Sequence, residues 1–138
     1  FNKLRGSDDD DEDAKTYFRE LAVYTPDYRG ELAIWLHALA FVYAEQGLTL
    51  LATPLVREAL RINESLRYNH NTGLTLSALS GIERMAGQYD SAIRHAEEAM
   101  DLFRSLEDPH GVTLAYQKLV QAKRQKAKQL FENRRKLE

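Results

Sequence analysis

Cysteine is absent from this 138-residue chain, which excludes disulfide bonds, thiolate nucleophiles and metal sites with sulfur ligands. Long apolar runs are missing as well. The longest, Leu32 to Ala44, is interrupted by His37 and is too short to cross a bilayer. The N-terminus is polar and soon becomes acidic, so it does not resemble a signal peptide. These absences predict a cytoplasmic protein that has no membrane partner.

The residue types that usually carry catalysis or hold cofactors are present but scattered. The seven glycines form no phosphate-binding loop. No two of the four histidines are spaced like paired metal ligands on one helix; they are His37, His70, His95 and His110. Neighbouring carboxylates such as Glu97 and Glu98 would point in different directions on a helix, so they make no acid–base pair. We therefore expect no enzymatic activity, no metal and no cofactor.

Charge is concentrated at the two ends of the chain, although the net charge is only −2. Residues 8–13 form an unbroken acidic run that repels itself, so we expect residues 1–13 to be a disordered linker or tail. The run lacks the alternating ligands and the glycine turn of a calcium-binding loop. The C-terminal end, from Lys118 to Lys136, is basic. Its cations suit either contacts with nucleic-acid phosphates or the polar outer face of a helix that caps a stack.

Apolar residues recur at intervals of three and four through most of the chain, which is typical of amphipathic helices. Gly47 and Gly87 are expected to end helices, and Asn69–Asn71 and Asp108–Gly111 to form loops. Asp90 is a good candidate for an N-cap. No segment has the pattern of a strand. The predicted fold is all-α, with about six helices in antiparallel pairs, over about residues 13–24, 31–46, 50–66, 75–86, 90–106 and 112–137.

Two segments of the chain, residues 33–67 and 73–107, match each other at a spacing of 40 residues. The matched pairs include Leu36 with Leu76, Leu39 with Leu79, Gly47 with Gly87, Ala52 with Ala92, and Ala59 with Ala99. Self-similarity at a fixed period of this size is typical of a solenoid of stacked helical repeats. A single helix pair cannot bury its own apolar face, so neighbouring pairs must cover each other.

The stretch Gly87–Ile93, followed by Ala96, Ala99 and Leu102, resembles the second half of a tetratricopeptide repeat. In that family a small residue in the first helix, here Ala40 or Ser80, lets the paired helix pack closely. The resemblance extends over about Glu31 to Lys123. It contains one good copy of the repeat, one fair copy and one half copy, in which Ala127 stands where glycine is expected.

The resemblance divides the chain into consecutive units. A leading helix and loop would span residues 14–30, the first repeat 31–70 and the second 71–110. Residues 111–138 would form a degenerate third repeat or a basic capping helix. The extended 40-residue repeats are similar to those of bacterial signalling ATPases and multidomain transcriptional regulators. We therefore expect this chain to be part of a larger bacterial signalling or regulatory protein.

The resemblance also implies that the chain is a scaffold, because the first helices of tetratricopeptide pairs line a concave face that binds partners. The partner would be a protein, a peptide or another domain of the parent chain, and self-association is a further expectation. The expected groove residues are Ile34, His37, Phe41, Glu45, Ser77, Gly81, Arg84, Gln117, Gln121 and Arg124.

Two other functions stay open at this point. A segment that senses a small molecule would need a closed apolar pocket near Trp35, Phe41 and Tyr43. A nucleic-acid-binding regulator would need the basic side chains of the last helix gathered on one side. The glutamines and acids among those cations, and the slightly acidic chain as a whole, weigh against nucleic acid.

Overall fold

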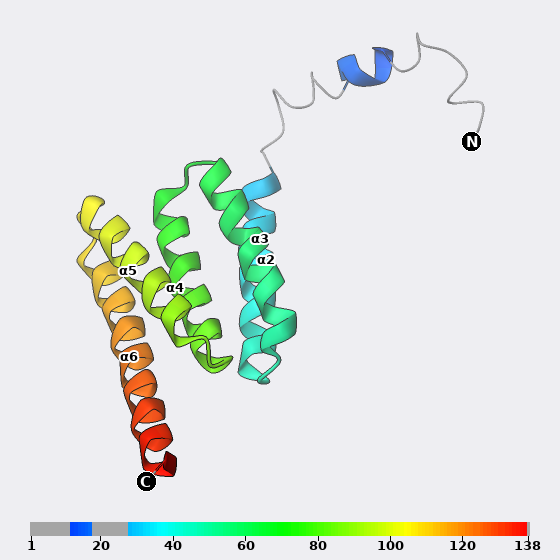
Figure 1. The fold of residues 1–138 in the computed structure, drawn as a ribbon. Helices are drawn as coiled ribbons and strands as arrows, with labels where there is room; N and C mark the ends of the chain where they lie inside the picture. Colours follow the sequence, from blue (N-terminus) through cyan, green and yellow to red (C-terminus); the bar gives the residue numbers. More distant parts are fainter. Residues whose placement is uncertain (1–11, 18–27, 138) are drawn as a thin grey trace.

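The computed structural model describes residues 12–17 and 28–137 (Figure 1). From residue 28 onward the chain is a row of antiparallel helices in which each helix packs on the next. Strands do not occur among the described residues, so the predicted all-α fold of stacked helix pairs is confirmed. The helices of the row are α2 (Tyr28–Glu45), α3 (Thr49–Ser65), α4 (Asn69–Met85), α5 (Tyr89–Ser105) and α6 (Pro109–Leu137).

The leading part of the chain is described only in part. Residues 12–17 are helical, which agrees with the start of the helix predicted over residues 13–24. The rest of that prediction, and most of the expected acidic tail, lie outside the described residues.

The row of helices has an inner and an outer side. Helix α4 contacts both α2 and α6, whereas α3 and α5 do not contact each other. The first helices of successive pairs are therefore close together, and the second helices are spread apart. This arrangement makes the side that carries α2, α4 and α6 the concave side of the stack.

All four turns of the row have the same backbone structure. At each turn a residue with positive φ follows the helix end: Gly47 (77°), Arg67 (57°), Gly87 (81°) and Glu107 (54°). The next N–H donates to the carbonyl five residues back, as from Leu48 to Tyr43 at 2.9 Å. These bonds are those of a Schellman motif, which satisfies the last carbonyls of a helix. Because the four turns lie 20 residues apart, the 40-residue sequence period corresponds to two helix-and-turn units.

Every helix of the row begins earlier than the sequence predicted: α4 by six residues, α2 and α6 by three each, and α3 and α5 by one. Asn69–Asn71 is the first turn of α4, and Asp108–Gly111 contains the start of α6 and is not simply a loop. Pro109 occupies the first helical position, where its missing N–H is not needed. The carboxylate of Asp108 accepts a hydrogen bond from the N–H of Gly111 at 3.1 Å, which satisfies one free donor of the new helix.

The glycines that suggested loops serve a packing purpose. Gly73 of α4 and Gly111 of α6 both face the buried ring of Phe103 on α5. A Cβ at Gly73 would lie 2.5 Å from Cζ of Phe103, and one at Gly111 would overlap the same ring. The two glycines are therefore needed inside helices, where they leave room for an aromatic ring between α4 and α6.

The prediction of Asp90 as an N-cap was wrong. The N-cap of α5 is Gln88, and its side chain makes no capping hydrogen bond. Asp90 lies in the first turn of α5, where its Oδ1 accepts a hydrogen bond from Nζ of Lys126 at 2.5 Å. Its negative charge still stabilises the positive end of the helix dipole.

The contacts between helices are lined mainly by alanine. The small residues expected there are all buried: Ala40, Ala52, Ala59, Ala92, Ala96 and Ala99. Larger side chains fill the space between them, chiefly Val56, Leu79, Ile82 and Phe103. Small residues on one helix against larger ones on the next let the backbones approach closely without leaving cavities.

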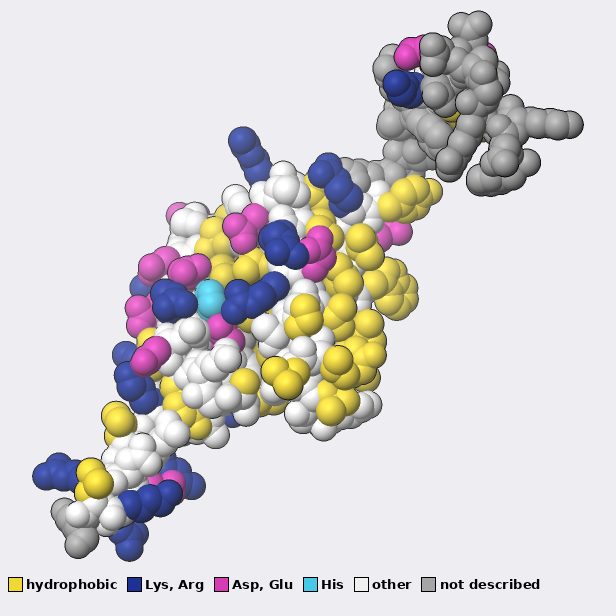
Figure 2. Space-filling view, turned by 45° about the vertical axis from the view of Figure 1, so that its right-hand side comes forward, with side chains coloured by type: hydrophobic (Ala, Val, Ile, Leu, Met, Phe, Trp, Pro, Cys, Tyr) yellow, Lys and Arg dark blue, Asp and Glu magenta, His cyan; other side chains and the backbone are white. Residues whose placement is uncertain are grey.

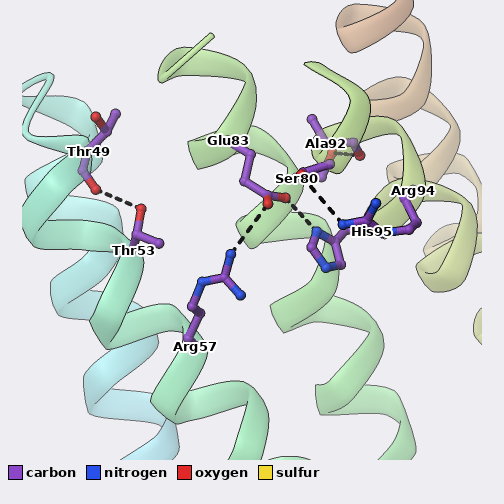
Figure 3. Close-up of polar contacts among 9 residues, drawn as sticks. Thr49, Thr53, Arg57, Ser80, Glu83, Ala92, Arg94 and His95 are labelled. Carbon is purple, nitrogen blue, oxygen red and sulfur yellow. Dashed lines mark hydrogen bonds and ion pairs between the residues drawn. The ribbon is translucent and has the colours of Figure 1, made fainter. Parts of the chain in front are cut away.

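One carboxylate is buried between three helices (Figure 3). The side chain of Glu83 on α4 is only 1% exposed. Its Oε1 lies 2.5 Å from Nδ1 of His95 on α5, and its Oε2 lies 3.6 Å from Nη2 of Arg57 on α3. In the 40-residue register Glu83 replaces Tyr43, so a polar link between the two repeats takes the place of an aromatic side chain.

The turn geometry leads to a first prediction. Glu107 has φ of 54°, a conformation that costs residues with a Cβ more than glycine, and its charge opposes the negative end of the α5 dipole. We expect Glu107→Gly to raise the free energy of unfolding by about 0.5–1 kcal/mol, measured by urea denaturation. The matched change Glu98→Gly, within α5, should lower it by about 1 kcal/mol. Equal losses from both changes would contradict the turn geometry.

The buried carboxylate leads to a second prediction. Loss of the imidazole in His95→Ala leaves Glu83 with only the distant Arg57 as a partner, so we expect a destabilisation of about 2–3 kcal/mol. The control is His110→Ala, because the side chain of His110 is exposed at the start of α6. Its effect should stay within about 0.5 kcal/mol. Thermal unfolding followed by circular dichroism measures both, and equal effects would argue against a buried pair.

Candidate partner-binding groove

A groove runs along the concave side of the stack and is lined only by the first helices of the pairs. It encloses about 430 Å³ between α2, α4 and α6. Its lining residues are His37, Ala40, Phe41, Ala44, Glu45, Leu74, Ser77, Ala78, Gly81, Ile82, Arg84, Met85, Leu114, Lys118 and Gln121. A second cavity of about 270 Å³ adjoins the groove, because His37 and Leu74 line both.

The structure brings most of the residues expected in a groove together. Seven of the ten line the main groove: His37, Phe41, Glu45, Ser77, Gly81, Arg84 and Gln121. Ile34 lines the adjoining cavity instead. Gln117 and Arg124 line neither of the two.

The side of the groove formed by α2 and α4 is largely apolar. Ala40, Ala44 and Ile82 belong to the buried core and form its floor. Phe41 is 60% exposed beside them, so its ring is available to a partner. A large apolar side chain that projects from a rigid helix next to a small-residue floor is a typical anchor point for a bound segment.

Two cations also line the groove, one from α6 and one from the C-terminal end of α4. Lys118 on α6 lies over α4, where its Nζ is 3.4 Å from the position a Cβ of Gly81 would take. Arg84 on α4 donates to the side chain of Gln125 at 3.2 Å, while its Nε is buried without a partner. Among the described residues no carboxylate forms an ion pair with either cation. Burial of Lys118 lowers the pKa of its ammonium, and the nearby charge of Arg84 lowers it further.

The adjoining cavity is lined by apolar residues together with a few uncharged polar side chains. The apolar residues are Ala33, Ile34, Ala38 and Leu74, and the polar ones are His37, Asn63, Asn71 and Thr75. Asn63 of α3 is 4% exposed at its wall, and its amide donates to Oγ1 of Thr75 at 3.0 Å while its Oδ1 has no partner. His37 stands between the two cavities, and burial lowers the pKa of its imidazole, so the ring is neutral at pH 7. Hydrogen bonding, not charge, is what this end of the groove offers.

Two polar residues that the sequence prediction missed are Lys118, which lines the groove, and Asn63, which lines the adjoining cavity. Lys118 follows Gln117, a predicted groove residue, by one position, and its equivalents Ala38 and Ala78 also line the two cavities. The 40-residue register therefore contained a signal for Lys118. Asn63 had no such signal, since it comes from the second helix of a pair.

Within residues 12–17 and 28–137, His, Asp and Glu never come together in a set of three or more that would suit a metal ion. In the same residues every helix is too short or too polar to span a membrane.

Comparison with known proteins agrees with this architecture. A tetratricopeptide repeat model matches residues 31–105, which include α3, α4, α5 and most of α2. No curated protein and no solved structure gives a significant match. Because the family match spans more than half of the chain, this protein belongs to the tetratricopeptide repeat family, whose helix pairs serve as scaffolds for protein–protein interaction.

Proposed function

We propose that the groove between α2, α4 and α6 binds a segment of a partner protein, or of a neighbouring domain in the same parent protein. The observation that carries this proposal is that the exposed ring of Phe41 shares one groove with Arg84 and Lys118, two cations that form no ion pair with a carboxylate of the described residues. A volume of about 430 Å³ suits a few residues of a bound segment. The groove can receive such a segment without rearranging, because its lining lies on packed helices.

The chemistry of the lining specifies the partner further. Phe41 and the alanine floor favour a large apolar side chain, since burial of apolar surface drives most association. Arg84 and Lys118 are half-buried and repel each other, so a carboxylate placed between them relieves the repulsion and gains charge-assisted hydrogen bonds. The proposed ligand is therefore an acidic segment that carries an apolar anchor.

The two alternative functions have less support. A small-molecule sensor would need a closed pocket near Trp35, but this side chain is 72% exposed and lines neither cavity. The cations from Lys123 to Lys136 fall on several sides of α6 at 3.6 residues per turn, and Figure 2 has basic side chains on different sides of this end. We also place the scaffold in a larger bacterial signalling or regulatory protein, on the strength of its extended repeat alone.

A peptide selection tests this proposal. Random peptides displayed on phage are selected for binding to the protein. The enriched peptides are synthesised, and their affinity for the protein is measured by fluorescence anisotropy. We expect enrichment of Asp or Glu beside a large apolar residue, and about a thirtyfold loss of affinity in Phe41→Ala, as for an interface anchor. Arg84→Gln should weaken binding and reduce its dependence on salt.

The matched control is Lys123→Gln, which removes one charge from an exposed position outside the groove. It should leave the affinity unchanged. Peptides that bind equally well to wild type and to Phe41→Ala, with circular dichroism confirming the fold of both, would contradict the proposal.

A further inference from the structure

Helix α2 carries an apolar stripe on a face that is separate from the groove. The stripe consists of Tyr28, Leu32, Trp35, Leu39 and Val42, at alternating intervals of four and three residues. All five side chains are exposed, from 43% at Leu39 to 72% at Trp35. Figure 2 shows hydrophobic side chains gathered over this side of the molecule. Intervals of four and three are those at which one helix packs along another.

The same positions are covered in the next repeat. The residues that lie 40 positions later are Tyr68, just before α4, and Thr72, Thr75, Leu79 and Ile82 within it, and these last four are at most 9% exposed. Helix α3 covers them: Ala52 and Val56 pack on Leu79 and Ile82. The side chain of Asn63 on α3 donates to Thr75 in the same contact.

The third helix of this type repeats the arrangement. In α6 the equivalent residues Ala115, Leu119 and Ala122 are buried. Helix α5 supplies the cover, since its Ala99 and Phe103 pack on Ala115. The positions of α4 and α6 that are equivalent to the stripe are therefore covered in the same way. In each case the cover is the preceding helix of the chain, which runs antiparallel to them. Among the described residues, α2 alone of these three lacks such a cover.

The segment before α2 has the pattern and length to supply one. Residues 13–24 are predicted to form an amphipathic helix with Tyr17, Phe18, Leu21 and Ala22 on one face, and residues 12–17 are helical in the structure. Three residues would separate the end of the predicted helix from Tyr28. Three residues also separate each pair of successive helices in the row. Its twelve residues would extend about 18 Å, close to the roughly 21 Å from Tyr28 to Val42 along α2.

We propose that the apolar stripe of α2 is the docking surface for residues 13–24 of the same chain, as a helix that takes the place α3 takes against α4. The docked segment gives α2 the same cover from a preceding helix that α4 and α6 have. It also removes the largest exposed apolar surface of α2 from water, which a lone folded chain rarely leaves open.

Trp35 provides a built-in reporter, because it is the only tryptophan of the chain and lies at the centre of the stripe. In the full chain at low concentration we expect Trp35 fluorescence typical of a shielded indole. The double change Phe18→Ser and Leu21→Ser should shift the emission to longer wavelength and increase quenching by acrylamide. The matched control, Arg19→Ser with Val23→Ser, alters the other side of the predicted helix and should leave both unchanged.

Two results would overturn the proposal. In the first, the wild-type protein shows the emission wavelength of an exposed Trp35 indole, and the Phe18→Ser and Leu21→Ser double change does not alter it. The other is shielding that appears only as the protein concentration rises, together with dimers in sedimentation, because a second copy would then be the occupant. Far-UV circular dichroism checks that the helices of residues 28–137 persist in every variant, and the groove assays above do not depend on either outcome.

Discussion

The first helix of each antiparallel pair has apolar residues on more than one face. The requirement to cover all of these faces determines how the helices stack. Helix α4 illustrates it, because α3, α5 and α6 pack around it and bury Leu76, Leu79 and Ile82 together with seven small or polar residues. No helix of the row could satisfy this requirement alone, so the fold is stable only as a stack. Alanine at the contacts and Schellman turns at fixed intervals keep the successive helices close enough for each to cover the next.

The groove follows from the same packing. Close contact of α4 with α2 and with α6 places their remaining faces together on the concave side, where Lys118 lies over Gly81. The core underneath holds the lining rigidly, and the buried link between Glu83 and His95 ties the second repeat together. A partner that binds here would lose little free energy to ordering of the protein, which is the advantage of a preformed site. Specificity then rests on a few side chains, chiefly Phe41, Arg84 and Lys118.

Much of the fold could be predicted from the sequence, because a pattern that recurs after 40 residues indicates that the same helix pair with the same packing occurs twice. Gly47 and Gly87 marked two of the four turns, whereas Arg67 and Glu107 adopt the same conformation without glycine and gave no local signal. Gly73 and Gly111 misled the prediction of helix starts, since their role depends on Phe103, a contact that only the folded chain reveals.

The groove was predictable to the extent that repeat register determines which side a residue faces. Phe41, Gly81 and Arg84, which were predicted on this basis, line the groove. Asn63 could not be predicted, because it reaches the adjoining cavity from α3, and the neutrality of His37 depends on burial that no sequence pattern reports. That Lys118 forms no ion pair with a carboxylate of the described residues is likewise a property of the three-dimensional arrangement.

The account depends most on the concave side being the binding surface, and amide NMR spectra of the protein titrated with a selected peptide test this directly. We expect the chemical shift changes to cluster in α2, α4 and α6, around Phe41, Gly81 and Lys118, and to leave the outer faces of α3 and α5 unaffected. Changes confined to α3 and α5, or to the basic end of α6 beyond Lys123, would show that the partner binds elsewhere and would contradict the account.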